Sequence, residues 1–329
     1  MYRPELSGSR VKLIFFYLLF AVLLLSAVQP AFSLSRKGIA AKAWIVIDEN
    51  DSVLSEKFPS AKLPPASTVK LMTAMVALDH MDSSASVTVS RKAQAARSGK
   101  PRLKAGDVLT VSDLLHLALM RSINAAAVAL AEGASGTENA FVALMNQKAK
   151  DIGANDTHFE TASGLPKGKQ YTTARDLTII LKKALTYPLI REILGKKGWM
   201  VKTASGRELF LSNTDNLLWS RTDMIGGKTG FTCNARHCFV GALDTEKGLI
   251  YTAVLGAPSR SRLWKSALRL ADIGIRLQPD RPSSGSFEPL VPLPRRDILR
   301  WKPDNTMPQN AMGSDAGFQD WFAYPGLAF

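Results

Sequence analysis

The spacing of apolar and polar residues divides the chain into strands near both ends and helices between them. Apolar runs at residues 42–48 and 52–58 predict a first β-hairpin. From residue 67 to about residue 194, apolar residues recur at helical spacing, interrupted by loops, and an amphipathic run predicts a last helix over 262–277. Further strands are expected at residues 199–202, 208–211, 226–232, 238–243 and 249–255.

This order of elements predicts an α/β protein of the α+β type. Strands from the two ends of the chain would form one antiparallel sheet, and the helical block between them would be an inserted lobe. The sequence contains no internal repeat.

Three short motifs lie on this framework in a fixed order. Ser67-Thr-Val-Lys70 opens an apolar helix over residues 69–78 and follows Pro64-Pro65-Ala66. Residues three apart share one helix face, so Lys70 can place its amine beside the hydroxyl of Ser67. A serine needs a base, and a lysine serves as one when burial or a nearby cation lowers its pKa. Taken alone, the same two residues also fit a helix-capping serine and a solvated lysine.

The second motif, Ser122-Ile-Asn124, interrupts two apolar helical runs, the second of which should span 124–132 and end at Gly133. One interpretation is a turn between helices with a capping serine or asparagine. In the other, Ser122 passes a proton to a leaving amine and Asn124 contacts a substrate amide.

The third motif, Lys228-Thr229-Gly230, lies in a predicted strand that also contains Gly226 and Gly227. Glycines in a strand indicate close backbone approach, which a peptide laid along the strand requires. Lys228 and Thr229 would then meet a terminal carboxylate. The alternative is a bent edge strand with a solvated lysine.

Together, the three motifs are typical of penicillin-binding proteins and class A β-lactamases. The chain resembles the D-alanyl-D-alanine carboxypeptidases of the low-molecular-mass penicillin-binding protein family, over about residues 40–277. Two positions differ from the family pattern: Ile123 is bulkier than usual, and Thr214 stands where some relatives carry an arginine. The segments that carry the resemblance, besides the motifs, are residues 65–74, 109–115, 126–132, 157–165, 171–177 and 213–218.

The resemblance implies a β-lactamase/transpeptidase-like fold and a serine carboxypeptidase that removes the terminal D-alanine of peptidoglycan pentapeptides. It also implies inhibition by β-lactams. No metal or cofactor is expected, because the four histidines, at positions 80, 116, 158 and 237, form no H-x-x-x-H pair. Ser67 would be the acylated nucleophile, Lys70 its general base and Ser122 the proton relay. The backbone N–H groups of Ser67 and Phe231 would form the oxyanion hole. The implied substrate-binding residues are Asn124, Lys228, Thr229, Gly230 and Phe231.

Two alternatives remain open at the level of sequence. A class A β-lactamase deacylates with a glutamate in an E-x-x-x-N pattern, but Glu160, Glu192 and Glu208 have no asparagine four residues on. A catalytically idle wall-binding protein on the same fold is the second alternative, and the retention of all three motifs argues against it.

The two ends of the chain differ from its centre. Residues 1–33 combine basic residues with an apolar stretch and are typical of a signal peptide, although an uncleaved membrane anchor is an alternative. We expect the catalytic domain at 34–278 and a proline-rich tail at 279–329, because eight of the 17 prolines lie in that tail. The chain would be exported to the periplasm or to the outer face of the cytoplasmic membrane.

Charge and cysteine content fit an exported protein. The formal net charge of +14 suits an anionic envelope and peripheral contact with the membrane, and no nucleic-acid-binding motif is present. The two cysteines, Cys233 and Cys238, flank a predicted hairpin turn. They would form a disulfide in an oxidising compartment, or remain two free thiols.

Overall fold

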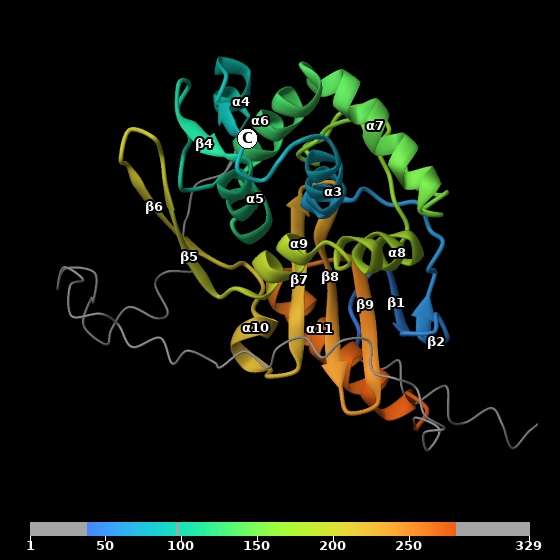
Figure 1. Cartoon of the computed structure of the whole chain (residues 1–329). Coiled ribbons are helices and arrows are strands. Elements are labelled where there is room, and N and C mark those ends of the chain that lie inside the picture. Colours follow the sequence, from blue (N-terminus) through green and yellow to red (C-terminus); the bar gives the residue numbers. More distant parts are fainter. Residues whose placement is uncertain (1–37, 97–98, 281–329) are drawn as a thin grey trace, which may run out of the picture. The chain divides into compact units, whose positions relative to one another are not determined.

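The main sheet draws its strands from both ends of the chain (Figure 1). In the computed structural model, which describes residues 38–96 and 99–280, five antiparallel strands have the order β2-β1-β9-β8-β7. Strand β1 pairs with β9, and this pairing joins the N-terminal hairpin to the C-terminal strands. The predicted architecture is therefore confirmed. The strands are β1 (Ala43–Asp48), β2 (Val53–Lys57), β7 (Met224–Thr232), β8 (Arg236–Thr245) and β9 (Gly248–Ala257).

Helices cover both faces of this sheet. Helix α11 (Arg260–Leu277) packs on one face, against β8 and β9, while α8 (Ala174–Ala184) and α9 (Pro188–Gly195) lie on the other (Figure 1). Coverage on both faces explains why every residue of β1 is buried and why the central strands are continuous apolar runs.

The inserted lobe is built around one buried helix, α3 (Lys70–His80), in which the eight residues from Lys70 to Ala77 are buried. A short two-stranded sheet, of strands too short to be predicted from sequence, adds to the lobe. It pairs β3 (Ser86–Thr88) with β4 (Val108–Thr110). The other elements of the lobe are the 3₁₀ turn Ala66–Val69, α4 (Arg91–Ala95), α5 (Val111–Met120), α6 (Asn124–Ser135) and α7 (Glu138–Asp151).

The strands expected near residues 199–211 do form, but they do not join the main sheet. Strands β5 (Gly198–Lys202) and β6 (Glu208–Ser212) make a separate hairpin, followed by α10 (Leu217–Ser220). Apolar residues on one hairpin face are buried beside α5, while Met200 and Phe210 on the other face are exposed. One covered face is sufficient for a hairpin that packs on a helix.

One predicted helix end was wrong. Helix α6 continues through Gly133 to Ser135 and ends at Gly136, whose φ of 73° is the left-handed conformation that stops a helix. Gly133 serves packing instead, because a Cβ there would lie 3.1 Å from the side chain of Val87. Helix α11 begins two residues before its predicted start, where the Ser259 hydroxyl accepts a hydrogen bond from the Arg262 amide.

The two cysteines are free thiols in the structure; Cys233 is exposed and Cys238 is buried. The predicted signal peptide and most of the predicted tail lie outside the described residues. Within residues 38–96 and 99–280, no helix is long and apolar enough to cross a membrane.

Candidate active site

Ser67 lies on a tight turn that the surrounding backbone holds in place. The 3₁₀ turn Ala66–Val69 follows Pro65, and Ala66 has a φ of 49°, a strained value for a residue with a side chain. Gly164 packs directly against this turn, and a Cβ at that position would collide with the Ala66 carbonyl oxygen. The loop containing Gly164 therefore supports the turn that presents Ser67.

Lys70 is the first residue of α3 and is completely buried, at 0% exposure. Its Nζ lies 2.8 Å from Ser67 Oγ, 2.7 Å from Asn124 Oδ1 and 2.6 Å from the Ser163 carbonyl oxygen. Burial, and secondarily the positive charge of Lys228, holds the pKa of Lys70 well below its usual value. A lysine in this environment loses its proton readily.

The three neighbours of Lys70 also orient its lone pair. A neutral amine has two N–H groups and one lone pair, whereas carbonyl oxygens can only accept hydrogen bonds. The Asn124 and Ser163 oxygens can thus take both N–H groups. The lone pair is then left facing Ser67, the one neighbour with a proton to give.

The second motif sits on the turn between α5 and α6, and its three residues have different surroundings. Ser122 has a φ of 59°, the second strained non-glycine residue of the site, and its Oγ accepts a hydrogen bond of 3.1 Å from Lys228 Nζ. Ile123 is fully buried in the apolar core, which accommodates its bulk. Asn124 opens α6 and faces Lys70.

Lys228 on β7 is the second fully buried lysine of the site. Its Nζ donates hydrogen bonds to Ser122 Oγ and, at 2.9 Å, to the Thr229 carbonyl oxygen. Burial lowers its pKa to about 7, while the carboxyl of Asp215 opposes that shift. Thr229 also contacts Thr214 through their hydroxyls at 2.8 Å, so Thr214 braces the third motif.

Strand β7 approaches the nucleophile at Gly230. A Cβ on Gly230 would lie 3.0 Å from the Ser67 amide nitrogen and 3.1 Å from the Pro65 carbonyl oxygen, tighter than ordinary contacts. Phe231 follows; its side chain is 55% exposed and packs on His237 at a ring distance of 4.5 Å. Strand β7 therefore passes the Ser67 backbone one residue before Phe231, whose N–H is the second predicted oxyanion donor.

The structure therefore gathers the predicted site residues Ser67, Lys70, Ser122, Asn124 and Lys228 around two buried amines, with Thr229, Gly230 and Phe231 along β7. Sequence reasoning missed two members of this cluster. The Ser163 carbonyl is a backbone group and has no signature in residue type. Asp215 lies in the segment 213–218 that contributed to the resemblance, but nothing there indicated that its carboxyl is buried near Lys228.

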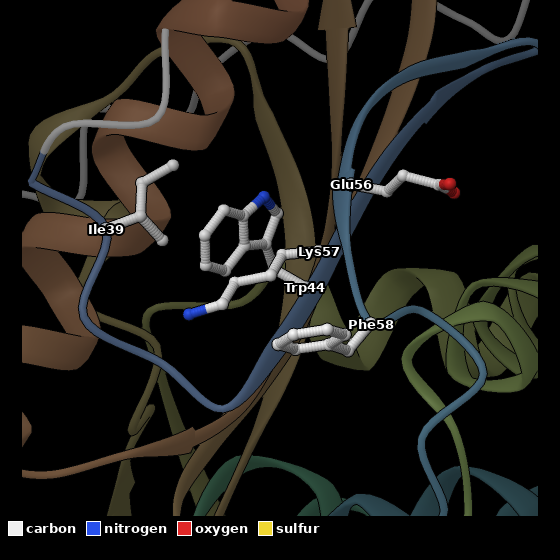
Figure 2. Close-up of a pocket in the computed structure, with 5 residues that line it drawn as sticks. All are labelled: Ile39, Trp44, Glu56, Lys57 and Phe58. Atoms are coloured by element: carbon white, nitrogen blue, oxygen red, sulfur yellow. The ribbon is translucent and has the colours of Figure 1, made fainter. Parts of the chain in front are cut away.

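A hollow of about 430 Å³ lies elsewhere, beside strands β1 and β2 at the edge of the main sheet (Figure 2). It is lined by Ile39, Trp44, Glu56, Lys57 and Phe58, with the Lys57 ammonium 5.1 Å from the Trp44 ring centre. In Figure 2, the Glu56 carboxylate points away from the indole of Trp44. None of these residues belongs to the three motifs, and they include no nucleophile paired with a base, so this hollow does not define the active site.

A serine hydroxyl beside a buried lysine amine, where a helical lobe meets an antiparallel sheet, is typical of serine-type peptidases of the penicillin-binding class. Comparison with known proteins identifies the family. The D-alanyl-D-alanine carboxypeptidase family, peptidase S11, matches residues 30–259, and the chain belongs to this family. The predicted family, fold and serine carboxypeptidase class are thus confirmed.

Individual relatives agree with this assignment. The chain is 36% identical to the D-alanyl-D-alanine carboxypeptidase DacB2 of Mycobacterium tuberculosis, over 79% of this chain and 90% of that protein. It is 34% identical to a D-alanyl-D-alanine endopeptidase of Pseudomonas aeruginosa, over 71% of this chain and 77% of that one. Its structure is similar to that of a mutant of the Streptomyces K15 DD-transpeptidase, with a TM-score of 0.69, 29% identity, and coverage of 72% and 98%.

Proposed function

We propose that this chain removes the terminal D-alanine from peptidoglycan stem pentapeptides through an acyl-enzyme on Ser67, and that penicillin inhibits it by acylating the same oxygen. One observation carries the proposal: the fully buried amine of Lys70 lies 2.8 Å from Ser67 Oγ and within hydrogen-bond distance of two carbonyl oxygens, those of Asn124 and Ser163. This arrangement supports a lysine that accepts the serine proton.

In the proposed acylation step, Ser67 Oγ forms a bond to the carbonyl carbon of the penultimate residue while its proton moves to Lys70 Nζ. The developing oxyanion accepts hydrogen bonds from the backbone N–H groups of Ser67 and Phe231. The bond to the leaving D-alanine then breaks: Ser122 gives its proton to the departing amine and receives the proton held by Lys70, which becomes neutral again. Water then adds its oxygen to the acyl carbon and gives a proton to Lys70; the ester bond to Ser67 breaks, the proton returns to Ser67 Oγ, and the shortened peptide leaves.

Lys228 would bind the terminal carboxylate of the substrate, with Thr229 and Gly230 beside it on β7. A buried cation gives a strong charge-assisted hydrogen bond to a carboxylate, and it favours a chain end over an internal amide. Asn124 would contact a substrate amide, in addition to its hydrogen bond with Lys70.

The same proposal includes the cell location and the boundaries of the chain. Residues 1–33 act as an export signal, residues 34–278 as the catalytic domain and residues 279–329 as a proline-rich tail. The enzyme acts in the periplasm or on the outer face of the cytoplasmic membrane, which it contacts peripherally. N-terminal sequencing of the protein recovered outside the cytoplasm would test cleavage near Ser33.

The test is to incubate the purified protein with a muropeptide pentapeptide and measure free D-alanine. The wild-type protein should release D-alanine, Ser67→Ala should release none, and the matched exposed-serine control Ser220→Ala should match wild type. If the wild-type protein is correctly folded but releases no D-alanine, the alternative of a catalytically idle wall-binding protein would be favoured.

Two further measurements separate the neighbouring activities. Labelled penicillin should bind one equivalent per enzyme through Ser67 and leave slowly, because no glutamate between the second and third motifs has an asparagine four residues on, as a class A β-lactamase requires. Rapid turnover of penicillin would mean a β-lactamase instead. A cross-linked muropeptide should be included because one relative is named an endopeptidase.

A further inference from the structure

Asp215 is a buried acid that the proposed acylation chemistry does not use. It is fully buried, at 0% exposure, in the segment between β6 and α10. Its Oδ1 accepts a hydrogen bond of 2.9 Å from the Leu217 amide, but its Oδ2 has no hydrogen-bond partner. An unpartnered buried carboxylate oxygen is costly, so this position is unfavourable unless a nearby positive charge compensates.

The backbone of this segment is fixed against both neighbouring motifs. The Thr214 amide donates a hydrogen bond of 3.0 Å to the Met120 carbonyl oxygen, two residues before Ser122. The Thr214 hydroxyl contacts that of Thr229, next to Lys228. Through the second contact, the chain at Asp215 is fixed against the segment of β7 that carries Lys228, and the charges of Asp215 and Lys228 act on one another.

The surroundings of Lys228 otherwise oppose its positive charge. Its hydrogen-bond acceptors within the described residues, Ser122 Oγ and the Thr229 carbonyl oxygen, are neutral. Within the described residues, two titratable groups interact with it: Lys70, which repels it, and Asp215, which attracts it. Strand β8, which pairs with β7 here, places Phe239, Val240 and Gly241 opposite this part of the strand, and none of them is charged.

From this arrangement we infer that Asp215 is a positioning residue that acts through Lys228. Its negative charge keeps Lys228 protonated, and it thereby sets the highest pH at which the enzyme binds its substrate efficiently. The inference rests on the proposed function, in which Lys228 must be charged to hold the terminal carboxylate. Asp215 itself touches neither the substrate nor the reacting atoms.

The direction in which the pH dependence of activity should move follows from the charges of the two buried groups. Burial raises the pKa of Asp215 and lowers that of Lys228, each to about 7, and their mutual attraction opposes both shifts. Lys228 is charged below its pKa, so activity should fall as the pH rises through that value. Without Asp215 the pKa of Lys228 drops further, and the fall should begin at a lower pH.

The variant Asp215→Asn isolates the charge. Asparagine keeps an Oδ1 acceptor for the Leu217 amide and nearly the same shape; it removes the negative charge and places an NH₂ group where Oδ2 was. The measurement is kcat/KM for a D-Ala-D-Ala peptide as a function of pH, with Asp223→Asn as the control for loss of a carboxylate near the start of β7.

In Asp215→Asn, we expect the alkaline fall of kcat/KM to move to lower pH by about one unit or more. A shift of that size is the usual effect of losing a neighbouring opposite charge. At a pH above this fall, the shift corresponds to about a 10-fold loss or more. Toward lower pH, kcat/KM of Asp215→Asn should approach that of wild type. In Asp223→Asn, the alkaline fall of kcat/KM should occur at the same pH as in wild type. A loss of equal size at every pH would show that Asp215 is only structural and would overturn the inference.

A second substrate separates this inference from the role proposed for Lys228. If the alkaline fall moves equally for a peptide with an amidated C-terminus, Asp215 still controls the charge of Lys228, but Lys228 does not read the carboxylate. If the alkaline fall of kcat/KM stays at the wild-type pH for both substrates, the inference about Asp215 is wrong, whether or not Lys228 binds the carboxylate.

The inference can also be tested if Asp215→Asn does not fold. In Lys228→Gln, Asp215 would lose its compensating charge, so carboxyl ¹³C NMR should report a pKa of Asp215 raised above the wild-type value. An unchanged pKa would contradict the coupling.

Discussion

Lys70 and Lys228 are two fully buried lysines in one site, and the pKa of Lys70 is lowered by its burial and, secondarily, by the charge of Lys228. Their proposed tasks need opposite states, because a base must be neutral and a carboxylate-binding group must be charged. The structure separates them by their partners. Lys70 is hydrogen-bonded to neutral oxygens only, whereas Lys228 has the carboxyl of Asp215 nearby. The first proton to leave this pair should therefore come from Lys70.

Lys70→Arg should strongly slow acylation although it preserves the positive charge. Arginine stays protonated in proteins, so it cannot accept the Ser67 proton. We expect the rate of penicillin acylation, followed by stopped-flow fluorescence or a labelled penicillin, to fall by roughly 10²–10⁴-fold, the usual contribution of a general base. The exposed control Lys62→Arg should be unaffected. Acylation near the wild-type rate in Lys70→Arg would mean that another group takes the proton.

Asn124→Asp should shift the pH dependence of acylation. It replaces a neutral amide oxygen 2.7 Å from Lys70 with a carboxylate, which favours the charged amine and raises the pKa of Lys70 by about 1–3 units. Because the base is active only above its pKa, the acidic limb of the acylation rate should move to higher pH. The exposed control Asn155→Asp should keep the wild-type limb, and an unmoved limb in Asn124→Asp would show that Lys70 does not set it.

Most of the fold was readable from sequence because its strands and helices have strong, separate periodicities. The predictions that were wrong or incomplete concern features that depend on tertiary neighbours. The alternation in β5 and β6 predicts strands but does not say which sheet they join. Gly133 and Gly136 are equally good helix stops by residue type, and only the packing of Gly133 on Val87 distinguishes them.

The site also contains groups that sequence can predict and groups that it cannot. Side-chain chemistry at fixed spacing predicts four of its residues, Ser67, Lys70, Ser122 and Lys228. The Ser163 carbonyl is a backbone atom, and it reaches Lys70 only because Gly164 lets its loop pack on the nucleophile turn. Asp215 reads as an ordinary polar residue between a strand and a helix until its burial beside Lys228 is known.

Gly164→Ala should disrupt the nucleophile turn. Gly164 has a φ of 80°, so alanine there costs about 1–2 kcal/mol of backbone strain, and its Cβ would also collide with Ala66. The matched control is Gly153→Ala, where φ is 84° but no atom lies within 4 Å of the added Cβ. Both variants should lower the thermal unfolding temperature, but only Gly164→Ala should also slow penicillin acylation. Equal acylation rates in the two variants would show that the contact with Ala66 is unimportant for the turn.

The native protein should expose one reactive thiol. Cys233 is exposed, whereas burial raises the pKa of Cys238 to about 12 and leaves it as an inert thiol. Mass spectrometry after treatment with iodoacetamide should find one modified cysteine in the native state and two after unfolding. Protection of both cysteines in both states, reversed by a reductant, would instead establish the disulfide that the sequence left open.

Lys228→Gln should weaken recognition of the substrate's end. A carboxypeptidase must prefer a free terminal carboxylate to an internal amide, and Lys228 is the buried cation that lies on the strand beside Ser67. A charge-assisted hydrogen bond is worth about 1.5–3 kcal/mol, so kcat/KM for a D-Ala-D-Ala peptide should fall by roughly 10- to 150-fold. Penicillin acylation should fall as well, because penicillin also carries a carboxylate. The exposed control Lys202→Gln should behave like wild type.

The same variant on an amidated peptide decides how Lys228 acts. The amide lacks the charge that Lys228 would bind, so wild type should already be slow on it and Lys228→Gln should cost little more. Lys228 Nζ also donates a hydrogen bond of 3.1 Å to Ser122 Oγ, which gives it a second route to the chemistry. If Lys228→Gln loses as much activity on the amide as on the free acid, that route is the important one. Lys228 would then orient the proton relay at Ser122 without reading the carboxylate.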